Sequence, residues 1–142
     1  KVPEDAMLLL ACGLPPQFGV DWVMRCVKAV NFQLTEAEQE ILELVDDWIL
    51  AQDGQTQQRL LVESLWKPER SAAVLLGLAV GFQSKLLAPQ WSMPVPEHFS
   101  AICLNEAVAT CLAMTEPYQR DITIQKFISL ALPLLDKLDA AS

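Results

Sequence analysis

The spacing of apolar residues is helical along the whole chain. Apolar side chains recur every three or four positions, and no stretch of useful length alternates between apolar and polar residues as a half-buried strand does. Prolines, glycines and capping residues divide this pattern into separate segments. The predicted helices cover residues 3–13, 18–30, 36–53, 57–66, 68–87, 97–114 and 121–138.

Several local signals set these boundaries. Thr35 and Glu38 have the spacing of a capping box at the start of the third helix, and Gly54 is expected to end that helix. Three prolines between residues 88 and 96 exclude a helix there, so an extended strap is predicted between the fifth and sixth helices. Pro133 is expected to kink the last helix one turn before its end.

The fifth and sixth helices are apolar on almost every side, which predicts a central position with the amphipathic helices packed around them. Gly77 and Gly81 fall on one face of the fifth helix and would let a neighbouring helix approach closely. Connections are short and no segment repeats another. We therefore predict an all-α fold, a single compact domain of about seven helices over residues 1–142.

Composition narrows the class of protein. The chain has 142 residues, of which 52% are hydrophobic, and this excludes a disordered chain. Ten basic against eighteen acidic residues give a formal net charge of −8, which argues against nucleic-acid binding. Residues 71–84 carry no charge but are too few to cross a membrane, so a buried core helix and no membrane span are predicted.

Candidate chemistry is sparse. Cys12, Cys26, Cys103 and Cys111 form no close pair and lie in apolar surroundings, so they are predicted to be buried free thiols, which favours a cytoplasmic location. His98 is the single histidine and has no partner at ligand spacing. No Gly-rich phosphate loop and no nucleophile–base set are present. We therefore expect no enzyme activity, no cofactor and no metal site.

The third predicted helix is strongly acidic. No Lys or Arg lies between Lys28 and Arg59, while seven of the eighteen acidic residues do. The commoner interpretation of such a run is a solvated helix face. The alternative is an electrostatic docking surface for a basic protein partner. Its candidate residues are Glu36, Glu40, Glu43, Asp46 and Asp47.

The strap holds the second candidate. Trp91 and Met93 stand between prolines, so a rigid exposed segment could present them to another protein. The favoured interpretation is structural: the strap crosses the ends of the core helices, and the side chain of Trp91 is buried.

The order of several short motifs resembles a known family. Along the chain come Asp21-Trp22-Val23, the acidic helix ending in Asp46-Asp47-Trp48, Arg59, then Gly81-Phe82-Gln83-Ser84 and the strap from Leu87 to Pro96. This order is similar to an uncharacterised bacterial family of small all-helical proteins associated with type VI secretion gene clusters. The resemblance covers roughly residues 15 to 114 and brings no catalytic residues. It implies a cytoplasmic accessory protein that works by binding.

Together these observations favour a non-enzymatic protein-binding factor, a chaperone or adaptor for a secreted effector or secretion component. One alternative is an immunity-type inhibitor whose acidic surface covers the basic active site of a toxin. Another is a small helical ligand-binding domain with a pocket among Trp22, Trp48 and Trp66. The sequence leaves the oligomeric state open.

Overall fold

The computed structural model describes residues 2–30, 33–83 and 99–141, although the side chains of residues 2–6, 8 and 141 are not considered below. Helices make up nearly all of this part of the chain, and no strand occurs in it, which confirms the all-α prediction. The elements are α1 (Val2–Gly13), α2 (Pro16–Ala29), α3 (Glu36–Ala51), α4 (Gly54–Leu65), α5 (Ala72–Gly81), α6 (Phe99–Ala113), the 3₁₀ turn η1 (Pro117–Gln119) and α7 (Arg120–Ala141).

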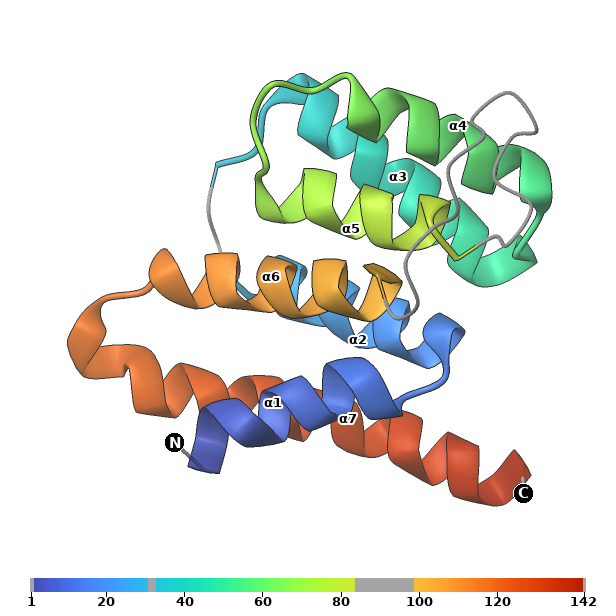
Figure 1. The fold of residues 1–142 in the computed structure, drawn as a ribbon. Helices are drawn as coiled ribbons and strands as arrows, with labels where there is room; N and C mark the ends of the chain where they lie inside the picture. The colour runs from blue at the N-terminus through green and yellow to red at the C-terminus, as the bar shows by residue number, and fades with distance from the viewer. Residues whose placement is uncertain (1, 31–32, 84–98, 142) are drawn as a thin grey trace.

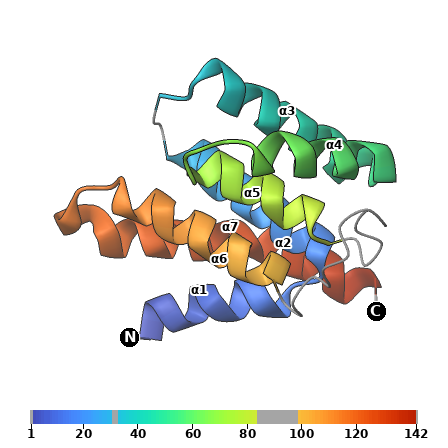
Figure 2. The same ribbon diagram turned by 45° about the horizontal axis from the view of Figure 1, so that its top comes forward.

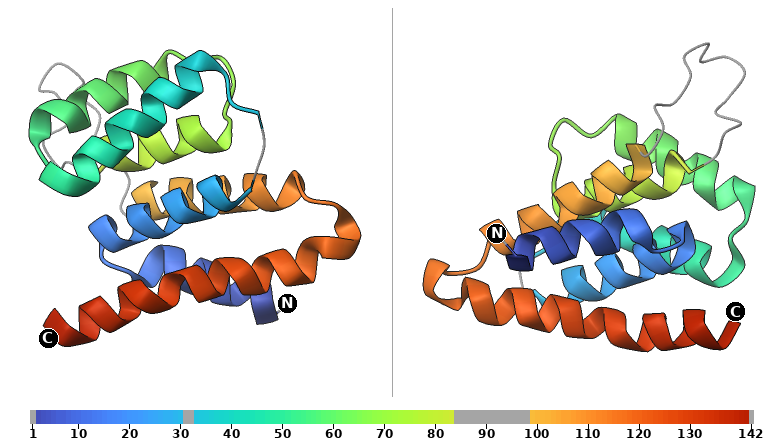
Figure 3. Two further views of the ribbon diagram at one scale, coloured as in Figure 1. Left: turned by 180° about the vertical axis from the view of Figure 1, so that it is seen from behind. Right: turned by 60° about the horizontal axis from the view of Figure 1, so that its bottom comes forward.

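The helices are stacked in three groups (Figure 1). α3, α4 and α5 lie together on one side, α2 and α6 cross the middle, and α1 and α7 form the opposite side. The view from behind shows the same three groups (Figure 3, left), and Figure 2 again shows α3 and α4 well separated from α1. Because α5 contacts α2, α3, α4 and α6, it connects the upper group to the rest of the molecule.

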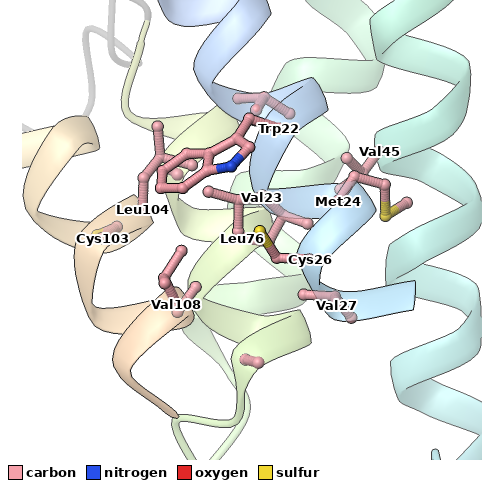
Figure 4. Packing of buried hydrophobic residues seen from close by; sticks show 14 of the residues in the cluster. Trp22, Val23, Met24, Cys26, Val27, Val45, Leu76, Cys103, Leu104 and Val108 are labelled. Carbon is pink, nitrogen blue, oxygen red and sulfur yellow. The ribbon is translucent and has the colours of Figure 1, made fainter. Parts of the chain in front are cut away.

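The centre of the fold is apolar. Nine residues of α5 are buried, which confirms its predicted central position. Figure 4 shows side chains of α2, α3, α5 and α6 meeting in this core. α6 differs from the prediction, because it buries only one side and leaves Ile102 52% exposed. α6 is the less apolar of the two helices, and its one charged residue, Glu106, lies on this exposed side.

Trp22 fixes α2 against the last helix. Its side chain has no exposed surface, and its Nε1–H donates a hydrogen bond of 2.8 Å to the carbonyl oxygen of Phe127. Phe127 is itself fully buried on α7. A buried indole needs a partner for its N–H, and here the carbonyl oxygen supplies it.

The start of α3 is as predicted, but its end is not. Thr35 Oγ1 accepts from the Glu38 N–H at 3.1 Å, and Glu38 Oε1 accepts from the Thr35 N–H at 3.0 Å, which confirms the capping box. The prediction that Gly54 ends this helix was wrong. Gln52 ends α3 in the left-handed conformation, with φ at 51°, and Gly54 is already the first residue of α4, capped by Asp53.

Four other boundaries also differ, and one of them is the end of α5, which lies at Gly81 where residue 87 was predicted. α2 begins at Pro16, two residues before the predicted start, since proline suits the first turn of a helix. α5 begins at Ala72 and not at Pro68, because Ser71 caps it by accepting from the Val74 N–H. α7 continues for eight residues beyond Pro133, where one turn was predicted. Leu134, next to this proline, is fully buried and anchors the continuing helix.

Gly77 and Gly81 allow the close helix contact that their spacing predicts. A β-carbon on Gly81 would lie 2.7 Å from Leu61 Cβ and 2.8 Å from Leu61 Cα, and one on Gly77 would overlap Ser64 Oγ. Both neighbours belong to α4. The inner side of α4 therefore packs against bare backbone of α5.

The predicted Pro/Trp strap at residues 88–96 lies outside the described residues. The same holds for the candidate partner residues Trp91 and Met93 and for His98.

Candidate functional site

The candidate site is a groove between α3 and α4. Two residues, Gln52 and Asp53, connect these helices, so they run antiparallel and side by side. The groove has a volume of about 280 Å³. Its floor is formed by Ala37, Ile41 and Leu44 of α3. The remaining lining residues are charged: Glu40, Glu43 and Asp47 of α3, and Arg59 and Glu63 of α4.

Four predicted acidic residues form one row on α3. Glu36, Glu40, Glu43 and Asp47 are all exposed, and their spacing of four, three and four places them on one helix face. Glu40, Glu43 and Asp47 border the groove, and Glu36 lies one turn beyond them. We call these four residues the acidic row. All four side chains are exposed, whereas Ile41 and Trp48 of the same helix are buried.

Asp46 does not belong to the row. Its two carboxylate oxygens each accept a hydrogen bond of 3.2 Å from Lys28 Nζ of α2. This pair lies at the surface, where such contacts contribute little to stability. Asp46 therefore lies on the side of α3 toward α2 and does not line the groove, so the structure does not bring it together with the other four candidates.

The groove concentrates negative charge. Four of its lining side chains are carboxylates, and Arg59 supplies one positive charge. Among the residues that the structure describes, these five form no ion pair within 4.0 Å. The carboxylates are thus available to a cation from outside. The sequence-based candidate set missed Glu63, although the two-residue turn before α4 was the signal that places this residue opposite α3.

A smaller hollow of about 110 Å³ lies at the far end of the same hairpin, where Thr35, Ala37 and Glu38 meet Lys67 and Pro68. Partial burial raises the pKa of Glu38. Hydrogen bonds from the Thr35 N–H, the Ser71 hydroxyl and the Thr35 hydroxyl lower this pKa by a larger amount, so the net shift is downward. The Glu38 carboxylate completes the capping box at the start of α3. We assign it a structural role.

The buried thiols are poor nucleophiles. Cys26, Cys103 and Cys111 are buried and free, as predicted, whereas Cys12 is exposed, contrary to the prediction. Burial raises the pKa of Cys103 to about 11 and that of Cys111 to about 12, and it raises the pKa of Cys26 strongly as well. These three thiols stay protonated at neutral pH. Within the described ranges, no group of His, Cys, Asp and Glu has the geometry of a metal site.

The three tryptophans proposed to line a pocket do not meet. Trp22 and Trp48 are buried in the core, whereas Trp66, at the end of α4, is 78% exposed. The buried side of α4 is formed by Leu60, Leu61 and Ser64, and Trp66 does not belong to it. Trp66 lies seven positions after Arg59 and four after Val62, and this spacing places it on the outer face of α4.

Comparison with known proteins gives one match. A model of a family of unknown function, DUF6931, matches residues 1–135. The chain belongs to DUF6931. This agrees with the expectation of an uncharacterised family. Neither the curated proteins nor the solved structures contain a match to the chain.

This DUF6931 protein has in its described part no helix with both the length and the apolar character needed to cross a membrane. The uncharged run in α5 is instead enclosed by other helices, because α2, α3, α4 and α6 all contact it.

Proposed function

We propose that the chain is a protein-binding factor without catalytic activity of its own, and that the α3–α4 groove with its acidic row binds a basic partner. The observation that carries the proposal is a hollow lined by four carboxylates that form no ion pair with other described residues. Acidic side chains in such a position speed the encounter with a basic surface and disfavour acidic partners.

The apolar floor supports binding to a protein better than binding to a simple cation. A hydrated ion gains nothing from the half-buried side chains of Ala37 and Leu44, whereas the aliphatic stem of a Lys or Arg side chain can cover them. Carboxylates spaced along one rigid helix also do not converge on one point, as metal coordination requires.

The finer proposal is that the partner is a secreted effector or a component of a type VI secretion system, for which the chain acts as chaperone or adaptor in the cytoplasm. This proposal is supported by the sequence resemblance described above. An immunity-type inhibitor would use the same surface. The two roles differ in outcome, because an inhibitor protects cells that produce the toxin, whereas a chaperone changes delivery of the effector.

The test is affinity capture from lysate of cells that produce the protein, with mass spectrometry of the retained proteins. Glu36, Glu40 and Glu43 are all replaced by Lys in the test variant. The matched control replaces the exposed acidic residues Glu106, Glu116 and Asp136 by Lys, which changes the net charge equally on other surfaces. We expect a basic partner that the wild type and the control retain and the groove variant loses. Equal retention by all three proteins would overturn the proposal.

A further inference from the structure

The outer face of α4 carries an exposed aromatic residue beside the acidic groove. Val62 is 41% and Trp66 78% exposed, and both lie on the same face as Arg59. Isolated exposed apolar residues are common, but tryptophan is the side chain that most often anchors protein interfaces. Its position relative to the acidic row therefore bears on what the groove binds.

Trp66 lies at the Glu36 end of the groove. α4 returns antiparallel to α3, so its last residues reach the first turn of α3. The smaller hollow confirms this, because Lys67 and Pro68 line it together with Thr35 and Ala37. Arg59, nearer the start of α4, falls toward the Asp47 end. The surroundings of the groove are therefore asymmetric: Trp66 lies outside its lining, toward the Glu36 end of the hairpin, and Arg59 lines it toward the other end.

We infer that the occupant of this groove is an amphipathic helix of the partner protein, with Lys or Arg along one edge and a large apolar residue packed on Trp66 and Val62. The inference rests on the proposed function and specifies the partner. It follows from charge complementarity to the acidic row and from the apolar floor between the two charged edges.

The spacing of the row favours a helix over an extended segment. At a rise of 1.5 Å per residue, neighbouring carboxylates of the row are about 5.5 Å apart along α3. Successive residues on one face of a partner helix repeat every 5.4 Å, so cations at positions i, i+4, i+7 and i+11 stay opposite the row. On one face of an extended strand the repeat is about 6.6 Å, and the cations would fall out of register within a few contacts.

Arg59 and Trp66 together set the direction of the partner helix. A cation near Arg59 is repelled, whereas one near Glu36 and Glu40 is attracted. The cationic residues of the partner are thus concentrated toward the Trp66 end. Removal of the Arg59 charge should strengthen binding of every basic helix.

The test uses a display library of 14-residue peptides stapled as helices, selected against the full chain. We expect enriched peptides with Lys or Arg at i, i+4 and i+7 and an apolar residue at one end. Their affinity, measured by fluorescence anisotropy, should fall at least tenfold with Trp66→Ala and with Glu40→Gln combined with Glu43→Gln. It should rise severalfold with Arg59→Ala. Tyr118→Ala, which removes another exposed ring on a different surface, should leave affinity unchanged.

The outcomes separate this inference from the proposed function. No enrichment, enriched peptides without the helical cation spacing, or affinity that ignores Trp66→Ala would overturn the inference. If the captured natural partner is lost with the groove charge reversal but retained fully by Trp66→Ala, the proposed function stands and the helix inference falls. Retention of the partner by both variants overturns the proposed function and the helix inference together.

Discussion

On its inner side α4 meets α5 so closely that Gly77 and Gly81 have no room for a β-carbon, whereas on its outer side α4 borders an open groove with α3. The inner contact buries Leu60, Leu61 and Ser64, and the outer edge exposes Arg59 and Trp66. One helix thus separates a surface that holds the fold together from a surface that contributes little to stability. Substitutions on the two sides should therefore affect different measurements.

The largest contrast is between two tryptophans. Trp22→Ala should lower the free energy of unfolding by about 4 kcal/mol, because it leaves a large cavity and the Phe127 carbonyl loses its partner. Trp66→Ala should change stability by less than about 0.5 kcal/mol. Urea unfolding followed by circular dichroism measures both. Comparable losses in the two variants would show that Trp66 is covered by protein.

The glycine contact should give the next effect. In Gly81→Ala the new β-carbon meets backbone as well as side-chain atoms of Leu61, so α4 and α5 must separate, which costs about 2 kcal/mol. Gly54→Ala is the matched control, since a β-carbon added there would have no neighbouring atom within 4 Å. It should stay within about 0.5 kcal/mol of the wild type in the same unfolding experiment. A Gly81→Ala protein as stable as the control contradicts the close packing.

Ser64 is the polar exception on the inner side of α4. It has no exposed surface, and its hydroxyl has no hydrogen-bond partner among the described residues. Ser64→Ala removes an unsatisfied polar group and improves helix propensity, so it should raise the free energy of unfolding by about 1 kcal/mol. A destabilised variant would reveal a hydrogen bond that the hydroxyl makes in solution.

The stability that Glu38 contributes should depend on pH. Its pKa in the folded protein lies below the ordinary value of 4.5, so its ionised form stabilises the fold above that pH, and the stabilisation is lost as the pH falls through the folded-state pKa. Glu38→Gln keeps the capping box but removes the charge. It should be less stable than the wild type at neutral pH, and the difference should shrink below pH 4.5. Urea unfolding of the two proteins at pH 7 and pH 3 measures the stability difference. An equal difference at the two pH values would contradict the prediction.

The smallest effect on stability belongs to the acidic row. Glu40 and Glu43 are exposed and form no ion pair with described residues. Replacing both with Lys relieves repulsion with Glu36 and Asp47, so thermal stability should stay the same or rise slightly. A clear fall in melting temperature would instead show that the row has a structural role.

Local signals predicted much of the fold. The apolar spacing, the Thr35–Glu38 capping box and the Gly77/Gly81 pair each depend on a few neighbouring residues, and each is confirmed. The failures were of two kinds. Gln52 takes a left-handed conformation that usually selects glycine, so Gly54, the better terminator in sequence, was mistaken for the helix end. The exposed side of α6 carries Ile102 beside Glu106, and this single charged residue was too weak a signal to predict that side.

Local helical spacing also made part of the site predictable. Acidic residues at helical spacing fall on one face whatever surrounds them, so Glu36, Glu40, Glu43 and Asp47 could be grouped from sequence. The ion pair of Asp46 with Lys28 depends on how α2 packs beside α3, which no local pattern specifies. Trp66 was grouped with Trp22 and Trp48 as an aromatic residue, although its helical spacing from Val62 and Arg59 places it on the outer face of α4.

The most direct measurement is carboxylate footprinting of the protein alone and in its captured complex, with carbodiimide-coupled labelling and mass spectrometry. A partner seated in the α3–α4 groove should reduce labelling of Glu40, Glu43, Asp47 and Glu63. Labelling of Glu106 and Asp136, on α6 and α7, should be unchanged. Protection of Glu106 and Asp136 with undiminished labelling of the groove carboxylates would contradict the assignment of the groove as the binding surface.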